Sequence, residues 1–408
     1  MFRFHPSVKW ESAYPNQRQI REKIISLWRR YGLESCTVFN APVTSVEKNL
    51  SGKWIINGNK AGYGLFDGVV VAVGVCGDPV VPRLPCHENF KGPTFHSSNL
   101  DGKEVRGKRV LIIGGGASAI EALEYAVTRG AAEIDVLSRS DKWVIPRNAI
   151  VDILLSLNVF GQQTYLAWIP EWLLQKFFYR DLDDISPANK GLYTDTPMVN
   201  SELFSQIRSG KARWLRGDVI TVKEDGILFN HRAKELPKGY PGRETLIQGD
   251  IFIMATGFKR PSLSFLPQRI FEDSYMPPNW YLQVFPPQVP SICAINSTYI
   301  DAIGPVGNYH IGIYTRLLLM FLVDPLARPQ EHMMKSWIEF TRFMKRLSPT
   351  GAFDFFTYAE LIYWYMFVVI INPFRWKWIL FVFFGIGRSL PMKVVEQEDR
   401  LRQEMNVK

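Results

Sequence analysis

The chain has 408 residues, of which 47% are hydrophobic and 21% charged; this allows two or three folded domains and argues against a disordered chain. Its formal net charge of +9 favours an anionic partner. Its lysines and arginines are spread along the chain without a zinc-ligand or RNA-binding signature, so nucleic acid is a poor candidate. A nucleotide phosphate or an anionic membrane surface fits better.

The four cysteines show neither metal-ligand nor redox spacing, so we expect no metal site and no disulfide framework. Reduced, mostly buried thiols in a reducing compartment are the simplest interpretation. The opening Met-Phe-Arg-Phe-His-Pro lacks the charged and apolar regions of a secretory signal. The expected location is therefore intracellular, either cytoplasmic or at the cytosolic face of a membrane.

Two similar segments lie far apart in the chain. The first runs from Phe66 and Asp67 through five apolar residues and Val73 to Gly74, and the second runs from Asp250 to Gly257 with the same spacing. Each predicts a buried strand that ends where backbone must approach a ligand or cross between domains. A chance match is the alternative, but the pair suggests one domain inserted into another.

The strongest pattern lies between these segments, at residues 109–137. Arg109–Ile113 predicts a strand buried on both faces, and a Gly-rich turn at 114–119 follows directly. Residues 120–131 then predict a helix that packs on a sheet, and 133–137 predict a second strand. This strand–turn–helix–strand unit has the usual length of a dinucleotide-binding motif, so an ordinary Gly-rich turn is the weaker alternative.

Each small residue of the turn has a predicted role. Gly114 permits the tight turn, and Gly116 lets the backbone approach a pyrophosphate. Ala119 allows the helix and strand to pack closely, and the N-terminus of the following helix presents free N–H groups to the phosphates. Ala117 and Ser118 of the turn are further expected cofactor contacts.

The end of the second strand selects between cofactors. NAD-binding units usually carry an acidic residue there, whereas this chain has Ser138, Arg139 and Ser140. A guanidinium beside hydroxyls would pair with a 2′-phosphate, which favours NADPH over NADH. The alternative for Arg139 is a solvated surface charge.

Three further segments follow. Residues 150–180 form an insertion rich in apolar and aromatic side chains. Gly304 and Asn308 lie in a turn that precedes an apolar helix at 311–323, although turn chemistry alone also explains the glycine. Residues 357–390 contain two apolar runs, and the break between them holds Asn372-Pro373 followed by Trp, Lys and Arg at 374–378; both runs are too short to span a membrane. Two interpretations of this stretch are open: a helical pair at a membrane surface, and a buried helical cap.

Taken together, the motifs resemble those of the flavin-containing monooxygenase superfamily, whose N-hydroxylating and Baeyer–Villiger members they match best. The features are the turn at 114–119, the F-x-G-x-x-x-H sequence from Phe90 to His96, the Met-Ala-Thr-Gly-Phe linker at 254–258, and the approach at 14–20 into an amphipathic helix ending near Gly32. The closest likeness is to fungal members that modify small molecules, some in secondary metabolism.

The resemblance implies FAD and NADPH as cofactors, O2 as co-substrate and a small organic substrate for N/S-oxygenation or Baeyer–Villiger chemistry. It implies no catalytic triad, because the cofactor carries the chemistry, and the catalytic residues are left unassigned. The implied cofactor contacts add Gly74, His96, Thr256, Gly257 and Asn308 to the turn and to Arg139. For His96, bonding across the domain joint is favoured over a direct part in cofactor cycling.

The fold implied is an α/β flavoprotein with two dinucleotide-binding domains and a C-terminal helical region. We expect flavin-domain parts at 1–74 and 258–330, the NADPH domain at 75–257, and the helical region at 331–408. The first FAD-binding G-x-G-x-x-G of the family has no counterpart in the first 108 residues, so the expectation is a shortened chain with weak flavin binding. A flavin-linked oxidoreductase without oxygen insertion and an NADPH-binding remnant are the alternative functions.

Overall fold

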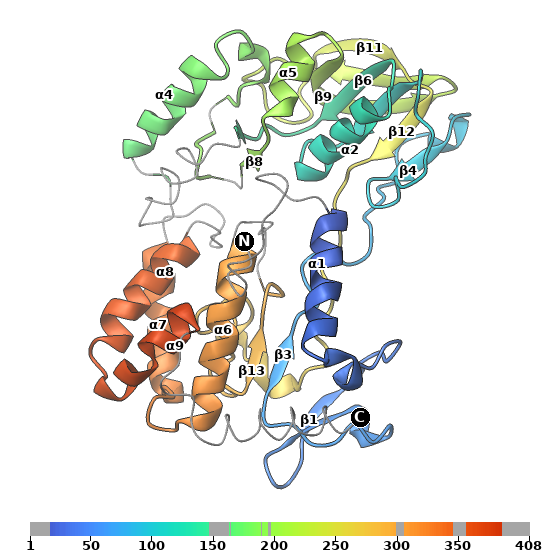
Figure 1. Ribbon diagram of the computed structural model, residues 1–408. Coiled ribbons are helices and arrows are strands. Elements are labelled where there is room, and N and C mark those ends of the chain that lie inside the picture. The colour runs from blue at the N-terminus through green and yellow to red at the C-terminus, as the bar shows by residue number, and fades with distance from the viewer. Residues whose placement is uncertain are drawn as a thin grey trace.

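The computed structural model describes residues 17–146, 163, 165–188, 190–194, 197–298, 306–345 and 356–385. The first part of the insertion predicted at 150–180 lies outside this set, namely residues 150–164 except 163. Residues 386–408 also lie outside it. Figure 1 shows two lobes: a sheet lobe at the top and a helical lobe at the bottom, with the first helix alongside the joint.

The sheet lobe is built on a seven-stranded sheet in the order β11-β10-β9-β6-β5-β12-β4. Five neighbouring strands run parallel, and the last two add an antiparallel edge. The parallel strands are β4 (Thr94–His96), β5 (Arg109–Ile113), β6 (Glu133–Ser138), β9 (Ala212–Lys223) and β12 (Ile251–Met254), and the edge strands are β10 (Gly226–His231) and β11 (Arg243–Gln248). Strands β5, β6 and β12 are almost entirely buried, which explains their unbroken apolar sequences.

Helix α2 (Ala117–Thr128) packs on this sheet through small and branched side chains, among them Ala119, Ile120 and Leu123. The two strands predicted at 109–113 and 133–137 are confirmed, the second with one added residue. The helix boundaries predicted at 120–131 are wrong by three residues at each end. Gly116 is the N-cap in an extended conformation, so the three residues after it already form the first helical turn.

Smaller elements complete the sheet lobe. Helix α4 (Trp168–Phe177) and helix α5 (Glu202–Arg208) flank it, and β7 (Val144–Ile145) pairs with β8 (Met198–Val199). Short 3-10 turns occur in both lobes. They are η1 (Leu33–Cys36), η2 (Asn57–Asn59), η3 (His87–Asn89), η4 (Tyr165–Ala167), η5 (Asp183–Ile185), η6 (Gln268–Ile270) and η7 (Asp273–Tyr275).

The helical lobe contains two small sheets beside α1 (Gln17–Arg30). β1 (Val46–Lys48) pairs antiparallel with β2 (Trp54–Ile56), and β3 (Val69–Val71) pairs parallel with β13 (Ile292–Ala294). Strand β3 is part of the first of the two similar segments, so these segments belong to different sheets, β3 here and β12 in the sheet lobe. Helix α6 (Val306–Val323) contacts β13.

The C-terminal part of the helical lobe folds into short helices. These are α7 (Glu331–Lys345), α8 (Phe356–Trp364), the π-helical turn η8 (Tyr365–Val369), the 3-10 helix η9 (Pro373–Trp378) and α9 (Ile379–Phe384). The break predicted at Asn372-Pro373 is confirmed, because the Asn372 side chain caps η9 by accepting from the Phe374 N–H at 3.0 Å. Among the described residues, no helix is both long and apolar enough to cross a bilayer.

Two short segments, 74–80 and 257–261, connect the lobes and run side by side. The backbone N–H of Gly77 donates to Lys259 at 2.8 Å, that of Lys259 donates to Asp78 at 2.7 Å, and that of Val80 donates to Gly257 at 2.9 Å. We call this pair the crossing segments. They lie at the boundaries expected for an inserted domain, so the division at residues 74 and 257 stays our working proposal.

The cysteines differ from expectation. All four are free, as predicted, but Cys36, Cys76 and Cys86 are exposed and only Cys293 is buried. The prediction of mostly buried thiols is therefore wrong. It relied on the average preference of cysteine for interiors, whereas these three residues lie in loops and short turns outside the cores.

Candidate dinucleotide site

The Gly-rich turn after β5 is shaped by contacts that leave no room for side chains. Gly114 has φ of +132°, and a Cβ there would lie 2.2 Å from the carbonyl oxygen of Ala255, which directly follows the neighbouring strand β12. A Cβ on Gly115 would lie 1.9 Å from Ser138 Oγ. These two glycines are therefore required by the protein's own packing, against β12 on one side and β6 on the other.

Gly116 differs from its two neighbours. A Cβ built there meets no atom within 4 Å, and its φ of −106° is open to any residue. The protein itself therefore does not need a glycine at this position. The space in front of Gly116 is what a pyrophosphate approaching the backbone would need.

The N-terminus of α2 opens onto the same space. No side chain caps it, so its first N–H groups and the positive end of its dipole are available to an anion. Ala117 and Ser118 are half-buried in this first turn, whereas Ala119 is fully buried and packs in the core of the sheet lobe.

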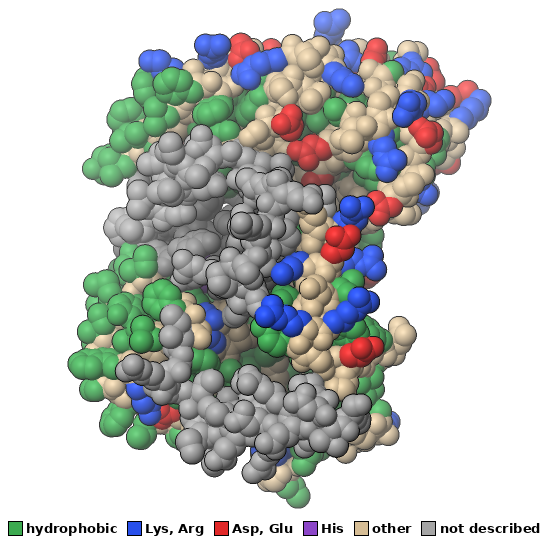
Figure 2. Space-filling model, viewed as in Figure 1, with side chains coloured by type: hydrophobic (Ala, Val, Ile, Leu, Met, Phe, Trp, Pro, Cys, Tyr) green, Lys and Arg blue, Asp and Glu red, His purple; other side chains and the backbone are tan. Residues whose placement is uncertain are grey.

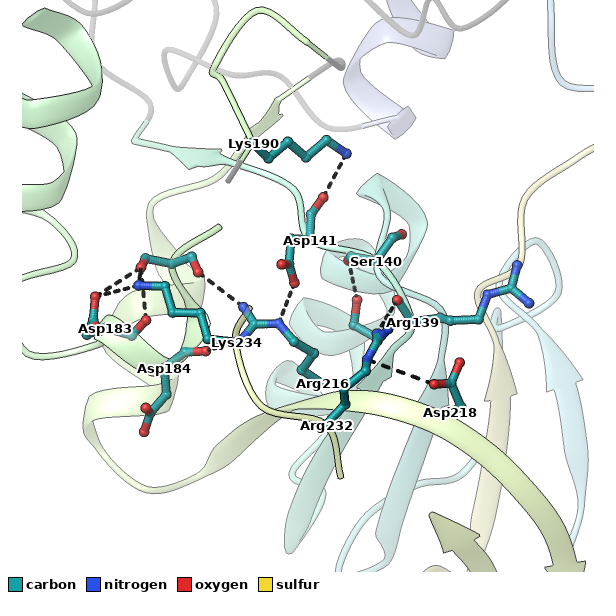
Figure 3. Close-up of polar contacts among 12 residues, drawn as sticks. Arg139, Ser140, Asp141, Asp183, Asp184, Lys190, Arg216, Asp218, Arg232 and Lys234 are labelled. Carbon is teal, nitrogen blue, oxygen red and sulfur yellow. Dashed lines mark hydrogen bonds and ion pairs between the residues drawn. The ribbon is translucent and has the colours of Figure 1, made fainter. Parts of the chain in front are cut away.

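Ser138 and Arg139, the two residues at the end of β6 that were predicted to select the cofactor, differ in burial. Ser138 is buried behind Gly115, and its hydroxyl donates to the Ser140 carbonyl at 2.8 Å. Its hydroxyl therefore holds the turn. Arg139 is exposed, and among the described residues its guanidinium has neither an ion pair nor a hydrogen bond (Figure 3).

Further cations surround the end of β6, and sequence reasoning missed them. Arg232 is buried and donates through Nη2 to the Arg139 carbonyl at 2.7 Å, so it positions the backbone of that residue (Figure 3). Arg216 pairs with Asp141 at 2.5 Å and donates to two carbonyls. Since β9 places Arg216 in register beside Ser138, reading 212–216 as the next parallel strand could have found it.

Lys234 completes this basic cluster. Its ammonium lies 2.7 Å from Asp183, and this hydrogen bond lowers the pKa of the Asp183 carboxyl. Arg216 and Lys234 are thus neutralised by carboxylates within the protein. Arg139 is the cation of the cluster that, among the residues described, keeps its charge available to a ligand.

His96 connects the sheet lobe to the second crossing segment. Its Nδ1 accepts from the Ser98 N–H at 3.2 Å, which leaves Nε2 as the protonated nitrogen. Nε2 then donates to the Gly257 carbonyl at 3.1 Å. Of the two roles considered for His96, this geometry matches bonding across the joint.

The rest of the F-x-G-x-x-x-H sequence also packs along β12. The Phe90 ring stacks on Phe252 with centroids 3.5 Å apart. Gly92 lies so close that a Cβ would be 2.3 Å from the Asp250 carbonyl oxygen. The three motif positions therefore contact the beginning, middle and end of one segment, which explains why the motif needs an aromatic residue, a glycine and a hydrogen-bond donor at this spacing.

The remaining predicted contacts lie at the crossing segments or outside the described side chains. Thr256 Oγ1 donates to the Val80 carbonyl, which ties the two segments together. Gly74 and Gly257 have φ of +74° and +84°, and a Cβ on either would face open space. Asn308 lies in the first turn of α6, and its side chain is outside the described set, as is Gly304.

Comparisons with known proteins agree on one family. The sequence profile described as "Flavin-binding monooxygenase-like" matches residues 5–325. Flavin-containing monooxygenase 3 of Homo sapiens is 28% identical over 69% of this chain and 54% of its own length. A Baeyer-Villiger monooxygenase of Pseudomonas aeruginosa is 30% identical over 36% of this chain and 28% of its own. The chain thus spans about half the length, or less, of these curated relatives.

Solved structures show the same architecture. An oxidised steroid monooxygenase bound to NADP aligns over 88% of this chain and 85% of its own, with a TM-score of 0.64 and 16% identity. A cyclohexanone monooxygenase bound to epsilon-caprolactone aligns over 90% and 86%, with a TM-score of 0.64 and 15% identity. At such identities the likeness shows the fold, and it confirms the predicted α/β class.

Proposed function

Because the chain belongs to the flavin-binding monooxygenase-like family, we propose that it is an FAD- and NADPH-dependent monooxygenase. It would insert one oxygen atom of O2 into a small organic substrate by N/S-oxygenation or a Baeyer–Villiger reaction, in secondary metabolism. Three observations carry the proposal: the open space at Gly116, the N-terminus of α2 without a side-chain cap, and the guanidinium of Arg139, which has no ion pair or hydrogen bond among the described residues.

The residues of this site fit NADPH. The N–H groups of Ala117 and Ser118 would bind the pyrophosphate, and Gly116 would let it approach the backbone. Arg139, with Ser140 beside it, would pair with the 2′-phosphate. NADPH supplies a hydride when bound. The protein's own part is to hold its phosphates and, through His96 and Thr256, to fix the crossing segments next to the turn.

For FAD, the described residues offer a partial fit. Gly74 and Gly257 have open space where backbone could approach a ligand, and Asn308 stands at the start of α6. Within residues 17–385, apart from the gaps given above, a second strand–Gly-rich turn–helix is absent. FAD therefore follows from the family alone, and no reaction step is assigned to it.

Cofactor selection is tested by Arg139→Ala. The guanidinium is exposed, so the lower part of the range for a charge-assisted hydrogen bond applies, and NADPH affinity should fall about tenfold. NADH affinity should stay within about twofold, because NADH lacks the 2′-phosphate. Lys142→Ala, three residues away, serves as the charge-matched control. An unchanged NADPH-to-NADH ratio in Arg139→Ala would refute the assignment.

The reaction is tested by NADPH oxidation with added FAD, a panel of amines, sulfides and ketones, and 18O2. Substrate-dependent incorporation of 18O supports the monooxygenase. NADPH oxidation that needs an artificial electron acceptor, without 18O in any product, would identify a flavin-linked oxidoreductase instead. NADPH binding without either activity would identify a binding protein.

We further propose that the chain works inside the cell at a cytosolic membrane surface. Figure 2 shows apolar side chains gathered along the same edge of both lobes, over α4 and over the C-terminal helices. Exposed apolar residues of these elements are Trp168, Trp172 and Phe177 on α4, and Met366, Ile370, Ile371, Phe374 and Trp376 between α8 and α9. An exposed apolar surface of this kind, with tryptophans, suits a bilayer interface.

Vesicle sedimentation tests this surface with the full chain. The double variant Phe374→Ser/Trp376→Ser should bind phosphatidylglycerol vesicles at least about fivefold more weakly, because two aromatic anchors are lost. Tyr240→Ser, an exposed aromatic position on the loop between β10 and β11, is the control. Equal sedimentation of the double variant and the wild type would contradict a membrane role for this surface.

A further inference from the structure

A cavity of about 410 Å³ lies in the helical lobe, away from the Gly-rich turn. Its wall comes from α7, the π-helical turn η8, the segment that leads into η9, and Tyr281. Apolar side chains dominate the wall, including Trp337, Phe340 and Phe367. The volume is within the usual range for small-molecule sites, and none of the described residues that line it belongs to the sheet lobe.

One charged group, Arg375, lines this apolar cavity. Its side chain is almost completely buried, with 3% of the residue exposed. Nε donates to the Ala327 carbonyl at 2.8 Å and Nη1 to the Val368 carbonyl at 2.6 Å. These bonds fix the guanidinium in place but do not neutralise it, and Nη2 has no hydrogen bond to any described residue.

The acidic groups nearby have other partners. Glu360 accepts from Gln283 at 2.9 Å and from Trp337 Nε1 at 3.2 Å. Asp324 pairs with Lys377 at 2.6 Å and accepts from Trp378. Burial lowers the pKa of Arg375, as expected for a cation that has no carboxylate partner among the described residues. A buried guanidinium without a counter-ion is costly, so an anion that reached it would be bound firmly.

The backbone around Arg375 is also unusual. Its acceptor, the Val368 carbonyl, lies in η8, a π-helical turn. Such turns are rare and occur frequently at functional sites, because they alter the regular hydrogen bonding of a helix. Here the turn orients one carbonyl toward the guanidinium and places the Phe367 side chain in the cavity wall.

We propose that this cavity binds an apolar molecule that carries one carboxylate, such as a medium-chain fatty acid, with the carboxylate on Arg375 and the chain against Trp337, Phe340 and Phe367. This site is separate from the dinucleotide turn. It does not depend on the monooxygenase activity.

Calorimetry with the full chain tests the proposal, with decanoate and the uncharged 1-decanol as probes. Decanoate should bind at a ratio of one per chain, and 1-decanol at least about tenfold more weakly, since it cannot form the charge-assisted pair. Arg375→Met should remove this preference. Because Arg375 also bonds two carbonyls, its thermal unfolding is measured in parallel.

A second variant avoids the structural role of Arg375. Ser336 lines the cavity from α7 and is exposed, so Ser336→Trp should fill the space and weaken decanoate binding at least about tenfold. Glu339→Trp, on the same helix but outside the lining, is the matched control and should bind as the wild type does. Equal affinity for the two probes, wild-type binding by Ser336→Trp, or no decanoate binding would each overturn the proposal.

Discussion

Replacing Gly116 with alanine should weaken NADPH binding while leaving the stability of the fold nearly unchanged. In the protein alone the new methyl group would meet nothing within 4 Å, and the φ of −106° suits alanine. Alanine lowers the entropy of the unfolded chain but is a poorer N-cap than glycine; each effect is worth up to about 1 kcal/mol, and they oppose each other. The free energy of unfolding should therefore change by less than about 0.5 kcal/mol.

NADPH binding should respond differently. A methyl group that occupies the space of the pyrophosphate costs about 1–3 kcal/mol, as in overpacked sites, which corresponds to a loss of affinity of about 5- to 150-fold. The dissociation constant is measured by calorimetry, and stability is measured by thermal unfolding without cofactor.

Gly115→Ala is the matched comparison. Its Cβ would lie 1.9 Å from Ser138 Oγ, and because Ser138 is buried the strain cannot be relieved by a simple rotation. This variant should lose about 1–3 kcal/mol of stability, and adding Ser138→Gly should restore part of it. The reasoning fails if Gly116→Ala binds NADPH like the wild type, or if it unfolds as readily as Gly115→Ala does.

Three further outcomes are expected. Hydrogen bonding to Arg109 lowers the pKa of the Asp250 carboxyl below 3.8, so this pair stabilises the fold above that pH and the contribution is lost as pH falls through the lower folded-state pKa. Both side chains are about one-third exposed, so Asp250→Asn should cost only about 0.5–1 kcal/mol in urea unfolding at pH 7, and the difference from wild type should shrink toward pH 3. His96→Ala loses the bond to Gly257 and should speed limited proteolysis of the crossing segments at least about threefold; an unchanged cleavage rate would argue against the clamp. A thiol reagent should titrate three cysteines in the native protein and Cys293 only after unfolding, and rapid reaction of all four would contradict its burial.

The sequence predicted the central part of the fold because that part is encoded locally. β5 and β6 are short, continuous apolar runs, and a strand buried on both faces has little other composition available to it. The start of α2 was missed because Ala117, Ser118 and Ala119 suit a turn and a first helical turn equally well. The backbone conformation of Gly116 decides between them, and it has no sequence signature.

The site was predicted in part for a related reason. Arg139 and Ser138 are adjacent, so the sequence treats them alike, but Ser138 is the last residue of β6 and is buried behind Gly115, whereas Arg139 lies just past the end of the strand and is exposed. Arg216 and Arg232 reach the same place from distant positions on β9 and after β10. Their convergence depends on strand order, and a single sequence does not reveal strand order.

The cavity at Arg375 lay beyond sequence reasoning altogether. In the sequence, Arg375 lies next to two tryptophans, and this composition predicts a cation at a membrane interface. Its burial against two carbonyls arises from the path of η8 and η9, which brings Ala327 and Val368 to one guanidinium. Only the folded chain distinguishes this cation from the exposed Lys377 two residues later.

The paired crossing segments have a mechanical consequence. The two crossing segments, joined by backbone hydrogen bonds, form a narrow ribbon. Such a ribbon bends more easily across its flat face than it twists or shears within its plane. We therefore expect relative motion of the lobes to occur mainly as bending of this ribbon, which is flanked by the positive-φ residues Gly74 and Gly257. Bending of this kind would change the angle between the two lobes, while the hydrogen bonds between the crossing segments would limit their rotation about the ribbon axis.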